Sequence, residues 1–203
     1  SQIAKDLLAS SYGVSGSKVR IIPHGIPVLD RRTDRQELKA EFGVAGRRLL
    51  LTFGLLSRNK GIETVIRALP ALVRRFPDVM YFVVGATHPT IVRREGEAYR
   101  TQLEREAEKL GVRDHVAFRA QFVADEELHR YLQAADIFVS PYLSEAQVTS
   151  GALSYAMGAG AAVVSTPYWH AQELLAGGRG RLFPFSDHEA LSQTLLELFS
   201  SPA

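Results

Sequence analysis

The chain has 203 residues, of which 46% are hydrophobic, so it is long enough for one large α/β domain with a sizeable core. Its 24 Lys and Arg residues nearly balance its 22 Asp and Glu residues, which argues against a nucleic-acid-binding surface or a charged membrane-binding face. Without Cys the chain has no disulfides and no thiolate metal site, and its six His residues lack a metal-ligand spacing. No apolar run approaches the roughly 20 residues of a membrane-spanning helix, and we expect a cytoplasmic location.

Strand-like and helix-like patterns alternate along the chain. A helical pattern precedes the turn region between Gly13 and Gly16. Apolar runs typical of buried strands follow at residues 19–22, 49–53, 80–84, 115–118, 137–140, 162–165 and 181–183. Apolar residues at helical spacing predict helices over 35–42, 62–76, 100–110 and 125–134, and two more that begin near residues 151 and 187. We expect residues 86–98 to form a long loop.

Three local signals refine these predictions. Pro70 lacks an N–H group, so it should kink or restart the helix predicted over 62–76. Thr149 or Ser150 can cap the helix that begins near residue 151. Ser186 and Glu189 have the spacing of a capping box at the start of the last helix.

The predicted strands are short and apolar without alternation, which indicates burial on both faces of the sheet. With helices between them, they predict an α/β fold with a doubly wound, parallel, Rossmann-like sheet. In such sheets ligands lie beyond the carboxyl ends of the strands. Five loops should therefore meet at one crevice, namely those after Phe53, Val84, Phe118, Ser140 and Ser165.

Two common site classes do not fit the sequence. Gly158 and Gly160 follow a helix and precede a strand, whereas a dinucleotide-binding fingerprint follows a strand and opens a helix. NAD binding is therefore not expected. The chain also lacks a Gly-x-Ser-x-Gly elbow, which argues against a serine hydrolase.

The most informative stretch runs over residues 137–175 and reads as strand, polar loop, helix, Gly-rich turn, strand, loop and helix. A loop that ends at a helix N-terminus offers free N–H groups and the positive end of a dipole, which suits a phosphate. The same loop carries the carboxylate of Glu145 and the amide of Gln147, which suit sugar hydroxyls. This layout indicates a nucleotide-sugar site.

The stretch resembles the C-terminal domain of GT-B glycosyltransferases of family 4, a retaining group. Ser-Tyr-Ala-Met-Gly-Ala-Gly at 154–160 resembles the family's Leu-Glu-Ala-Met-Ala-Cys-Gly, residues 161–165 resemble the strand after it, and Glu173 resembles the family's last acid. The resemblance extends over nearly the whole chain, through residues 18–27, 53–63, 114–118 and 135–141. It implies that residues 1–203 form the donor-binding half of a GT-B architecture.

The resemblance also implies the partners of this domain. The donor would be a nucleoside-diphosphate sugar, and neither a metal nor another cofactor would be needed. The acceptor, a carbohydrate or another hydroxyl compound, would bind on an N-terminal domain that is absent from this chain, and only that domain could associate with a membrane. The chain starts on a helical pattern without an initiator Met, in keeping with an excised domain. We expect the isolated domain to bind nucleotide weakly and to transfer no sugar.

Specific residues follow from the resemblance. Glu145 and Gln147 would be the catalytic residues that hold the donor sugar. The donor-binding residues would be Lys60 and Arg58 on the diphosphate, N–H groups of Ser150 and Gly151 beside it, and Gly54, Tyr155 and Glu173 around it. Most have an alternative structural explanation: a solvated loop lysine for Lys60, a loop acid and a helix N-cap partner for Glu145 and Gln147, ordinary helix capping for Ser150 and Gly151, a core position for Tyr155, and a surface or capping role for Glu173. His24 is better explained as a turn residue than as a site residue.

The sequence departs from the family pattern at three positions. The family has two glutamates eight positions apart, where this chain has Gln147 and Tyr155. Glu145 could replace the first, but a phenol cannot accept from a ribose diol as a carboxylate does. The family's loop arginine is Leu55 here, with Arg58 three residues further on. A non-catalytic nucleotide-sugar-binding or interaction module therefore remains an alternative, and a sugar-nucleotide epimerase is a less favoured one.

Overall fold

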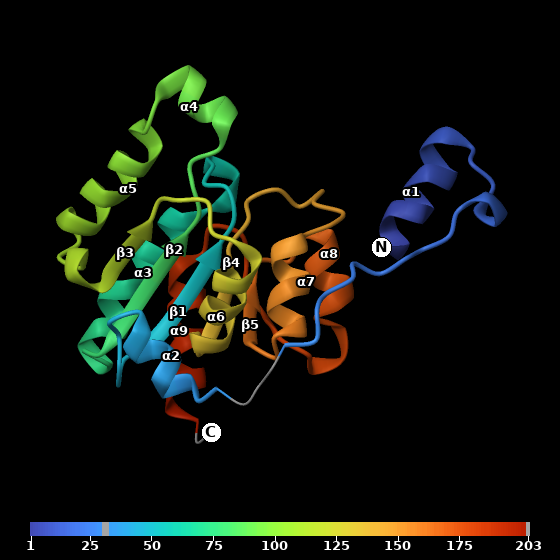
Figure 1. Ribbon diagram of the computed structural model, residues 1–203. Helices are drawn as coiled ribbons and strands as arrows, with labels where there is room; N and C mark the ends of the chain where they lie inside the picture. Colours follow the sequence, from blue (N-terminus) through green and yellow to red (C-terminus); the bar gives the residue numbers. More distant parts are fainter. Residues whose placement is uncertain (30–32, 202–203) are drawn as a thin grey trace.

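The computed structural model describes residues 1–29 and 33–201, and its centre is one parallel sheet of six strands (Figure 1). The strand order is β3-β2-β1-β4-β5-β6, so the order reverses between β1 and β4. The strands are β1 (Arg48–Phe53), β2 (Val79–Val84), β3 (Val116–Arg119), β4 (Ile137–Ser140), β5 (Ala162–Ser165) and β6 (Arg181–Leu182). This confirms the predicted doubly wound, Rossmann-like sheet.

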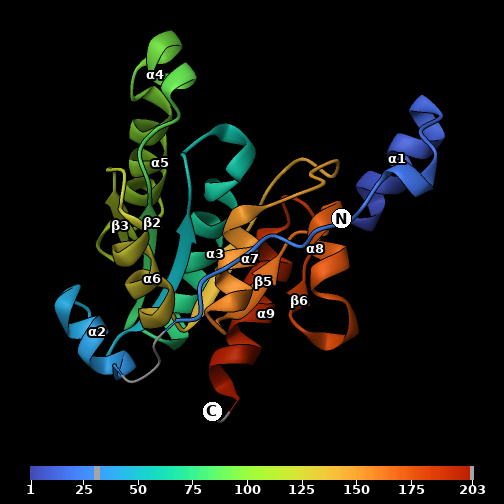
Figure 2. The ribbon, with the colours of Figure 1, turned by 45° about the vertical axis from the view of Figure 1, so that its right-hand side comes forward.

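Helices cover both faces of the sheet (Figures 1 and 2). One layer of the core joins the sheet to α3, α5 and α9, and the other joins it to α2, α6, α7 and α8. The helices are α1 (Gln2–Tyr12), α2 (Arg35–Glu41), α3 (Ile62–Arg75), α4 (Pro89–Glu95), α5 (Ala98–Lys109), α6 (Asp125–Ala134), α7 (Gly151–Gly158), α8 (Trp169–Leu174) and α9 (His188–Ser200). Short 3-10 turns occupy Gly16–Lys18, Arg58–Lys60, Arg113–His115 and Ala176–Gly178.

Strand β1 shows why these sequences form a two-sided core. Leu50 packs in one layer, whereas Leu49 and Leu51 pack in the other, and all three side chains are buried. Successive side chains of a strand point to opposite faces, so a continuous apolar run requires cover on both. The absence of polar alternation in residues 49–51 thus reflects helices on each side of the sheet.

A buried ion pair joins β1 and β4 at their amino ends. Lys39 of α2 is 3% exposed and donates 2.6 Å to the Asp136 carboxylate, which precedes β4. The same carboxylate oxygen accepts from the Leu49 N–H at 2.7 Å, and the Asp136 N–H donates to the Leu49 carbonyl. Asp136 therefore sets the pairing of the two strands at which the order of the sheet reverses.

The N-terminal segment lies apart from the sheet. Helix α1 has no buried residue, and Figure 2 shows it standing away from the rest of the chain with its first turn near α8. The strand predicted over residues 19–22 is wrong, because this segment has no strand partner and Ile22 is 80% exposed. The chain instead runs past α7, where the Ile26 side chain occupies the space beside Gly158.

Three other local predictions need correction. The loop predicted over residues 86–98 contains α4, which begins with Pro89 and is capped by the His88 ring accepting from the Thr90 N–H. Helix α3 continues through Pro70 as one element, so it does not restart there. The last helix is capped by Asp187, whose carboxylate accepts from the Ala190 N–H, because Ser186 adopts φ 58° outside the helix.

Within residues 1–29 and 33–201, no helix is both long and apolar enough to cross a membrane.

Candidate functional site

The loops at the carboxyl edge of the sheet meet, as predicted. Gly85 follows β2 at φ 136°, and a Cβ atom there would lie 2.3 Å from the carbonyl oxygen of Gly54, which follows β1. Gly61 has φ 62°, and its Cβ would lie 2.1 Å from the carbonyl oxygen of Pro141, which follows β4. Both glycines therefore permit a left-handed backbone and a close approach between neighbouring loops.

A hollow of about 190 Å³ opens where the loops after β1 and β2 face α6. Its lining is mostly apolar, with Phe53, Leu55 and Val84 on one side and the carboxylate of Asp125 at its rim. Phe122 of the loop after β3 also lines it and is 84% exposed. The loops after Phe53, Val84 and Phe118 thus enclose one concave, apolar space, which is the usual form of a small-ligand site.

Lys60 lies between the loops that follow β1 and β4. The short turn Arg58–Lys60 brings its amino group to 3.3 Å from the position that a Cβ atom on Gly54 would take. The amino group donates 2.6 Å to the Tyr142 phenol and lies 4.0 Å from the centre of that ring. Desolvation lowers the pKa of Lys60 to about 8, because burial disfavours the charged form. A nearby anion would favour the charged form and would therefore raise this pKa again.

Tyr142 belongs to a buried polar network under the site. Its ring stacks on Tyr168 with 5.1 Å between centroids, and burial raises the pKa of both phenols, that of Tyr168 to about 12. The Tyr168 phenol pairs with the Ser140 hydroxyl at 2.8 Å, and Thr166 donates 2.6 Å to the Tyr142 carbonyl. Ser150 lowers the pKa of both phenols against the effect of burial. Lys60 is therefore linked through Tyr142 to the loop that follows β5.

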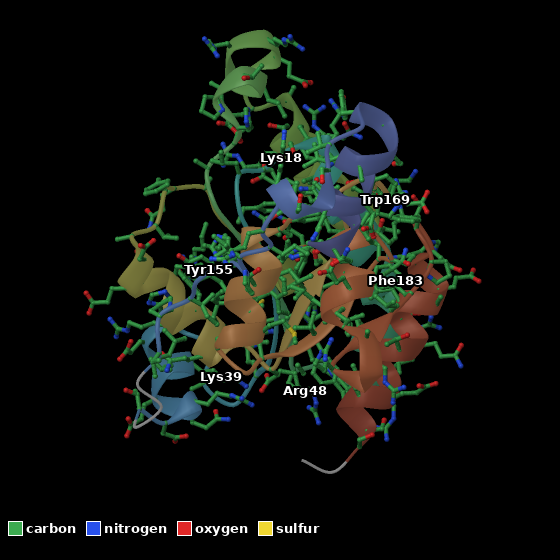
Figure 3. All side chains as sticks on the ribbon, turned by 90° about the vertical axis from the view of Figure 1, so that its right-hand side faces the viewer. Lys18, Lys39, Arg48, Tyr155, Trp169 and Phe183 are labelled. Carbon is green, nitrogen blue, oxygen red and sulfur yellow. The ribbon has the colours of Figure 1, made fainter. Side chains whose placement is uncertain are left out.

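The loop from β4 to α7, residues 141–150, is held at both ends. Near its start, the Leu143 N–H donates 3.0 Å to the Asn59 carbonyl beside Lys60. Near its end, the N–H groups of Trp169 and His170 each donate 3.0 Å to carbonyls of the loop, those of Glu145 and Gln147. The first turn of α8 therefore finds its backbone acceptors in this loop. Figure 3 shows Tyr155 on α7 and Trp169 at the start of α8.

Ser150 caps α7, as predicted, through a 3.2 Å bond from the Leu153 N–H to its hydroxyl. Its own N–H donates 2.8 Å to Nδ1 of His170, a ring that is 8% exposed. The backbone N–H that the sequence assigned to a phosphate is therefore occupied within the protein. Helix geometry leaves the N–H groups of Gly151 and Ala152 without an intrahelical acceptor, so these two are the donors that α7 offers.

The two residues predicted to be catalytic lie on this loop but differ in surroundings. Glu145 is exposed, whereas Gln147 is half-buried and its amide donates 2.6 Å to the Thr149 carbonyl. Tyr155 is half-buried among rings: His129 at 5.8 Å, His24 at 5.6 Å and Phe53 at 6.5 Å between centroids. The ring contacts of Tyr155 support a packing role for this residue. The predicted site roles of Glu145, Gln147 and Tyr155 stay predictions.

Arg58 and Glu173 lie in other contacts. Arg58 pairs with Glu95 of α4 at 2.9 Å, donates 3.0 Å to Gln102 and lies 4.9 Å from the Tyr99 ring centre. These bonds direct the guanidinium away from Lys60, toward α4 and α5. Glu173 accepts from the Gln2 N–H with both oxygens, at 3.0 and 2.9 Å, so it occupies the start of α1. Their predicted contacts with a donor would require these partners to change.

Sequence reasoning missed Tyr142 and His170. The sequence contains both, but their significance depends on Lys60 and Ser150, 82 and 20 positions away. The only available signal was their place directly after a predicted strand and within the Tyr-Trp-His segment. Among residues 1–29 and 33–201, no group of three or more His, Asp or Glu side chains could hold a metal ion.

Comparison with known proteins identifies the family. Residues 34–203 match the family model described as glycosyl transferases group 1. The chain is 31% identical to mannosylfructose-phosphate synthase of Agrobacterium fabrum, over 96% of this chain and 42% of that protein. It is 31% identical to a GDP-mannose-dependent alpha-(1-6)-phosphatidylinositol monomannoside mannosyltransferase of Mycolicibacterium smegmatis, over 70% of this chain and 35% of that protein. The chain therefore spans less than half the length of these two relatives.

Solved structures show the same architecture. The crystal structure of Anabaena HepE in complex with UDP superposes with a TM-score of 0.83 at 22% identity, over 98% of this chain and 52% of that one. This likeness shows the fold, one half of a GT-B arrangement. Together with the family match over most of the chain, it establishes that this protein belongs to the glycosyl transferases group 1.

Proposed function

We propose that this chain is the C-terminal, donor-binding domain of a retaining glycosyltransferase that uses a nucleoside-diphosphate sugar. The observation that carries the proposal is Lys60, a half-buried cation held by Tyr142 at the carboxyl edge of the sheet. Among residues 1–29 and 33–201 no carboxylate pairs with this cation, and a cation so placed is suited to the diphosphate of a donor. The name of the Mycolicibacterium relative, a GDP-mannose-dependent enzyme, agrees with this donor class.

The diphosphate would lie between Lys60 and the start of α7. Lys60 supplies a full positive charge, and the N–H groups of Gly151 and Ala152 supply the positive end of the helix dipole. During transfer, the bond between the anomeric carbon and the diphosphate oxygen breaks, the acceptor oxygen forms a new bond to that carbon, and the acceptor proton passes to the departing diphosphate. Negative charge then grows on the departing diphosphate, where these groups stabilise it. This arrangement would need no metal.

The nucleoside would occupy the apolar hollow beside Gly54 and Gly85, and the sugar would lie near Glu145 and Gln147. The acceptor would bind on a second domain and reach the sugar when the two domains close. Because this chain spans less than half of its relatives, we expect the isolated domain to bind a nucleotide weakly and to transfer no sugar.

A calorimetric binding screen tests the proposal. UDP, GDP and ADP, each with and without an attached sugar, are titrated into the wild-type chain, Lys60→Ala and Lys109→Ala. Lys109 is an exposed lysine of α5 and serves as the matched control. We expect one nucleotide to bind the wild type and Lys109→Ala, with at least tenfold weaker binding to Lys60→Ala. Equal binding to both variants would contradict the assignment of Lys60.

A non-catalytic nucleotide-sugar-binding module is the second candidate. It is favoured by one observation: Gln147 and Tyr155, which have no carboxylate, stand at the family's two glutamate positions. Both are also held within the protein, because Gln147 bonds to Thr149 and Tyr155 packs among rings. Transfer or slow donor hydrolysis by the full-length protein separates the two candidates. Turnover that Glu145→Gln abolishes would support the enzyme, whereas binding with no turnover would support the module.

A further inference from the structure

His170 makes the only side-chain contact described for the backbone N–H of Ser150, among residues 1–29 and 33–201. Nδ1 accepts this hydrogen bond at 2.8 Å, and the His170 N–H donates back to the Gln147 carbonyl at 3.0 Å. The Trp169 N–H adds a third bond, to the Glu145 carbonyl. One turn of α8 therefore fixes the loop on which the sugar-binding candidates and the cap of α7 both lie.

The bond requires one form of the imidazole. Because Nδ1 accepts, the neutral ring carries its proton on Nε2. Protonation would place an N–H at Nδ1, pointing at the N–H of Ser150, and two donors cannot share a hydrogen bond. The acceptor would be lost and a positive charge would face the positive end of α7.

The surroundings keep the ring neutral. Burial lowers the pKa of His170, and the His24 ring lowers it further, whereas Glu173 raises it. His24 comes from the segment before α2 and Glu173 from α8 itself, and both line one hollow with His170 and with Ser154 and Met157 of α7. His24 lies close to α7 as well, with its Nε2 3.4 Å from the position of a Cβ on Gly151.

We propose that His170 is a positioning residue for donor binding, which holds the loop 145–150 and the start of α7 in place only while its ring is neutral. This inference rests on the proposed donor site, because it assigns His170 to the same loop. It predicts that acid releases the loop and weakens nucleotide binding, without any contact between His170 and the nucleotide.

Two variants at one position separate the hydrogen bond from the ring. His170→Asn places an amide oxygen near the position of Nδ1, so it can accept from Ser150 without titrating. His170→Gln places its amide near the position of Nε2 and leaves the Ser150 N–H without that acceptor. His24→Gln is the control for the other imidazole in this region, and circular dichroism at each pH verifies that every variant is folded.

Nucleotide affinity is measured from pH 8 down to pH 5.5. Because the pKa of His170 is lowered, we expect wild type and His24→Gln to lose affinity progressively below the ordinary His pKa of about 6.5, with the largest loss at pH 5.5 and beyond the loss that His170→Asn shows. The Asn variant retains the titration of the nucleotide itself, so its curve subtracts that effect. His170→Gln should bind weakly at every pH. An Asn variant that follows the wild-type curve would overturn the proposal.

A second measurement does not depend on nucleotide binding. Long-range ¹H–¹⁵N spectra report the tautomer of His170, and amide exchange reports the protection of the Ser150 N–H. We expect the Nε2–H tautomer at neutral pH and a protected Ser150 amide whose protection factor, relative to the intrinsic exchange rate at the same pH, falls as the ring is protonated. An Nδ1–H tautomer, or protection unchanged by acid, would overturn the role of His170. If no nucleotide binds but these signals appear, the proposed donor site fails and the loop contact stands.

Discussion

The amino group of Lys60 and the ring of Tyr142 make a double contact: a 2.6 Å hydrogen bond to the phenol oxygen and a 4.0 Å approach to the ring centre. Tyr142 is 3% exposed, so the lysine reaches into the protein rather than into solvent. The contact holds a cation beside the point between β1 and β4 at which the strand order reverses, and its partner there is a phenol rather than a carboxylate. It ties the orientation of Lys60 to the loop after β4.

Tyr142→Phe should weaken nucleotide binding by about two- to thirteenfold, the effect of one hydrogen bond worth about 0.5–1.5 kcal/mol. The ring would still attract the cation, but the amino group would lose its fixed acceptor. Calorimetry at pH 7 measures the change. Tyr168→Phe is the control, because it removes a phenol from the same stack without touching Lys60. An equal loss of affinity in both variants would show that the stack, and not the contact with Lys60, is responsible.

Nucleotide binding should fall as the pH rises through about 8, the pKa of Lys60 in the ligand-free chain. Below this pH the amino group is charged and attracts the diphosphate, and above it the charge is lost unless binding restores it. Binding at pH 8 should therefore take up a proton. Calorimetry in buffers of different ionisation enthalpy detects this uptake, and a pH-independent affinity between 7 and 9 would rule out Lys60 as the diphosphate ligand.

The stability of the ligand-free chain should rise with pH over the range in which nucleotide binding falls. The pKa of Lys60 is lowered from 10.5 to about 8, so between these values the unfolded chain binds more protons than the folded one. The penalty of burying the charge is thus fully present below pH 8 and fades as the pH rises toward 10.5. Lys60→Met should raise the Tm at pH 7, and this gain should shrink by pH 10. A gain that stays constant with pH would contradict this explanation.

Asp136→Asn should destabilise the fold by about 3–5 kcal/mol, the cost of leaving a buried charge without its partner. The uncompensated charge would be Lys39, which is 3% exposed. Urea unfolding measures the loss. The double variant Lys39→Met with Asp136→Asn should recover part of it, and a single-variant loss below about 1 kcal/mol would show that water and the Arg47 carbonyl, which also accepts from Lys39, compensate the lysine.

Gly61→Ala should disturb the site through its backbone. A left-handed alanine costs about 1–2 kcal/mol by itself, and here its Cβ would also lie 2.1 Å from the Pro141 carbonyl oxygen. Gly111→Ala is a matched control, because Gly111 has φ 68° and nothing within 4 Å of its Cβ position. Gly111→Ala should lose only the stability that a left-handed alanine costs. Gly61→Ala should lose more than that and should also reduce nucleotide binding. Equal behaviour of the two variants would refute the steric argument.

The sequence predicted the fold because the sheet depends on local patterns. Each apolar run between 49 and 165 became a strand within about one residue, since burial on both faces leaves a continuous apolar signature. One failure was at residues 19–22, whose apolar side chains predicted a strand that the structure does not form. The other was at α4, where a polar sequence predicted a loop but a helix begins at Pro89, capped by His88. A strand requires a partner that its own residues do not specify.

The site was predicted less completely, because its contacts join distant segments. Lys60 and Ser150 lie where their position after a strand and before a helix predicted, in the segments that follow β1 and β4, and their roles toward a donor stay predictions. The partners that define their chemistry, Tyr142 and His170, depend on three-dimensional proximity. Arg58 and Glu173 match the family by position, yet their bonds to Glu95 and Gln2 depend on α4 and α1, whose placement no motif specifies.

Two lysine contacts occupy opposite ends of the same strand pair. Lys39 and Asp136 join β1 to β4 at the amino ends, whereas Lys60 and Tyr142 join the loops at the carboxyl ends. About four residues of strand separate the ends, roughly 13 Å, a distance at which substitutions usually act independently. Residues at the carboxyl end can therefore differ from the family pattern, as Gln147 and Tyr155 do, while the contact of Lys39 with Asp136 at the amino end still stabilises the fold. A site at the carboxyl end can therefore change its residues without loss of the contacts that hold the sheet together.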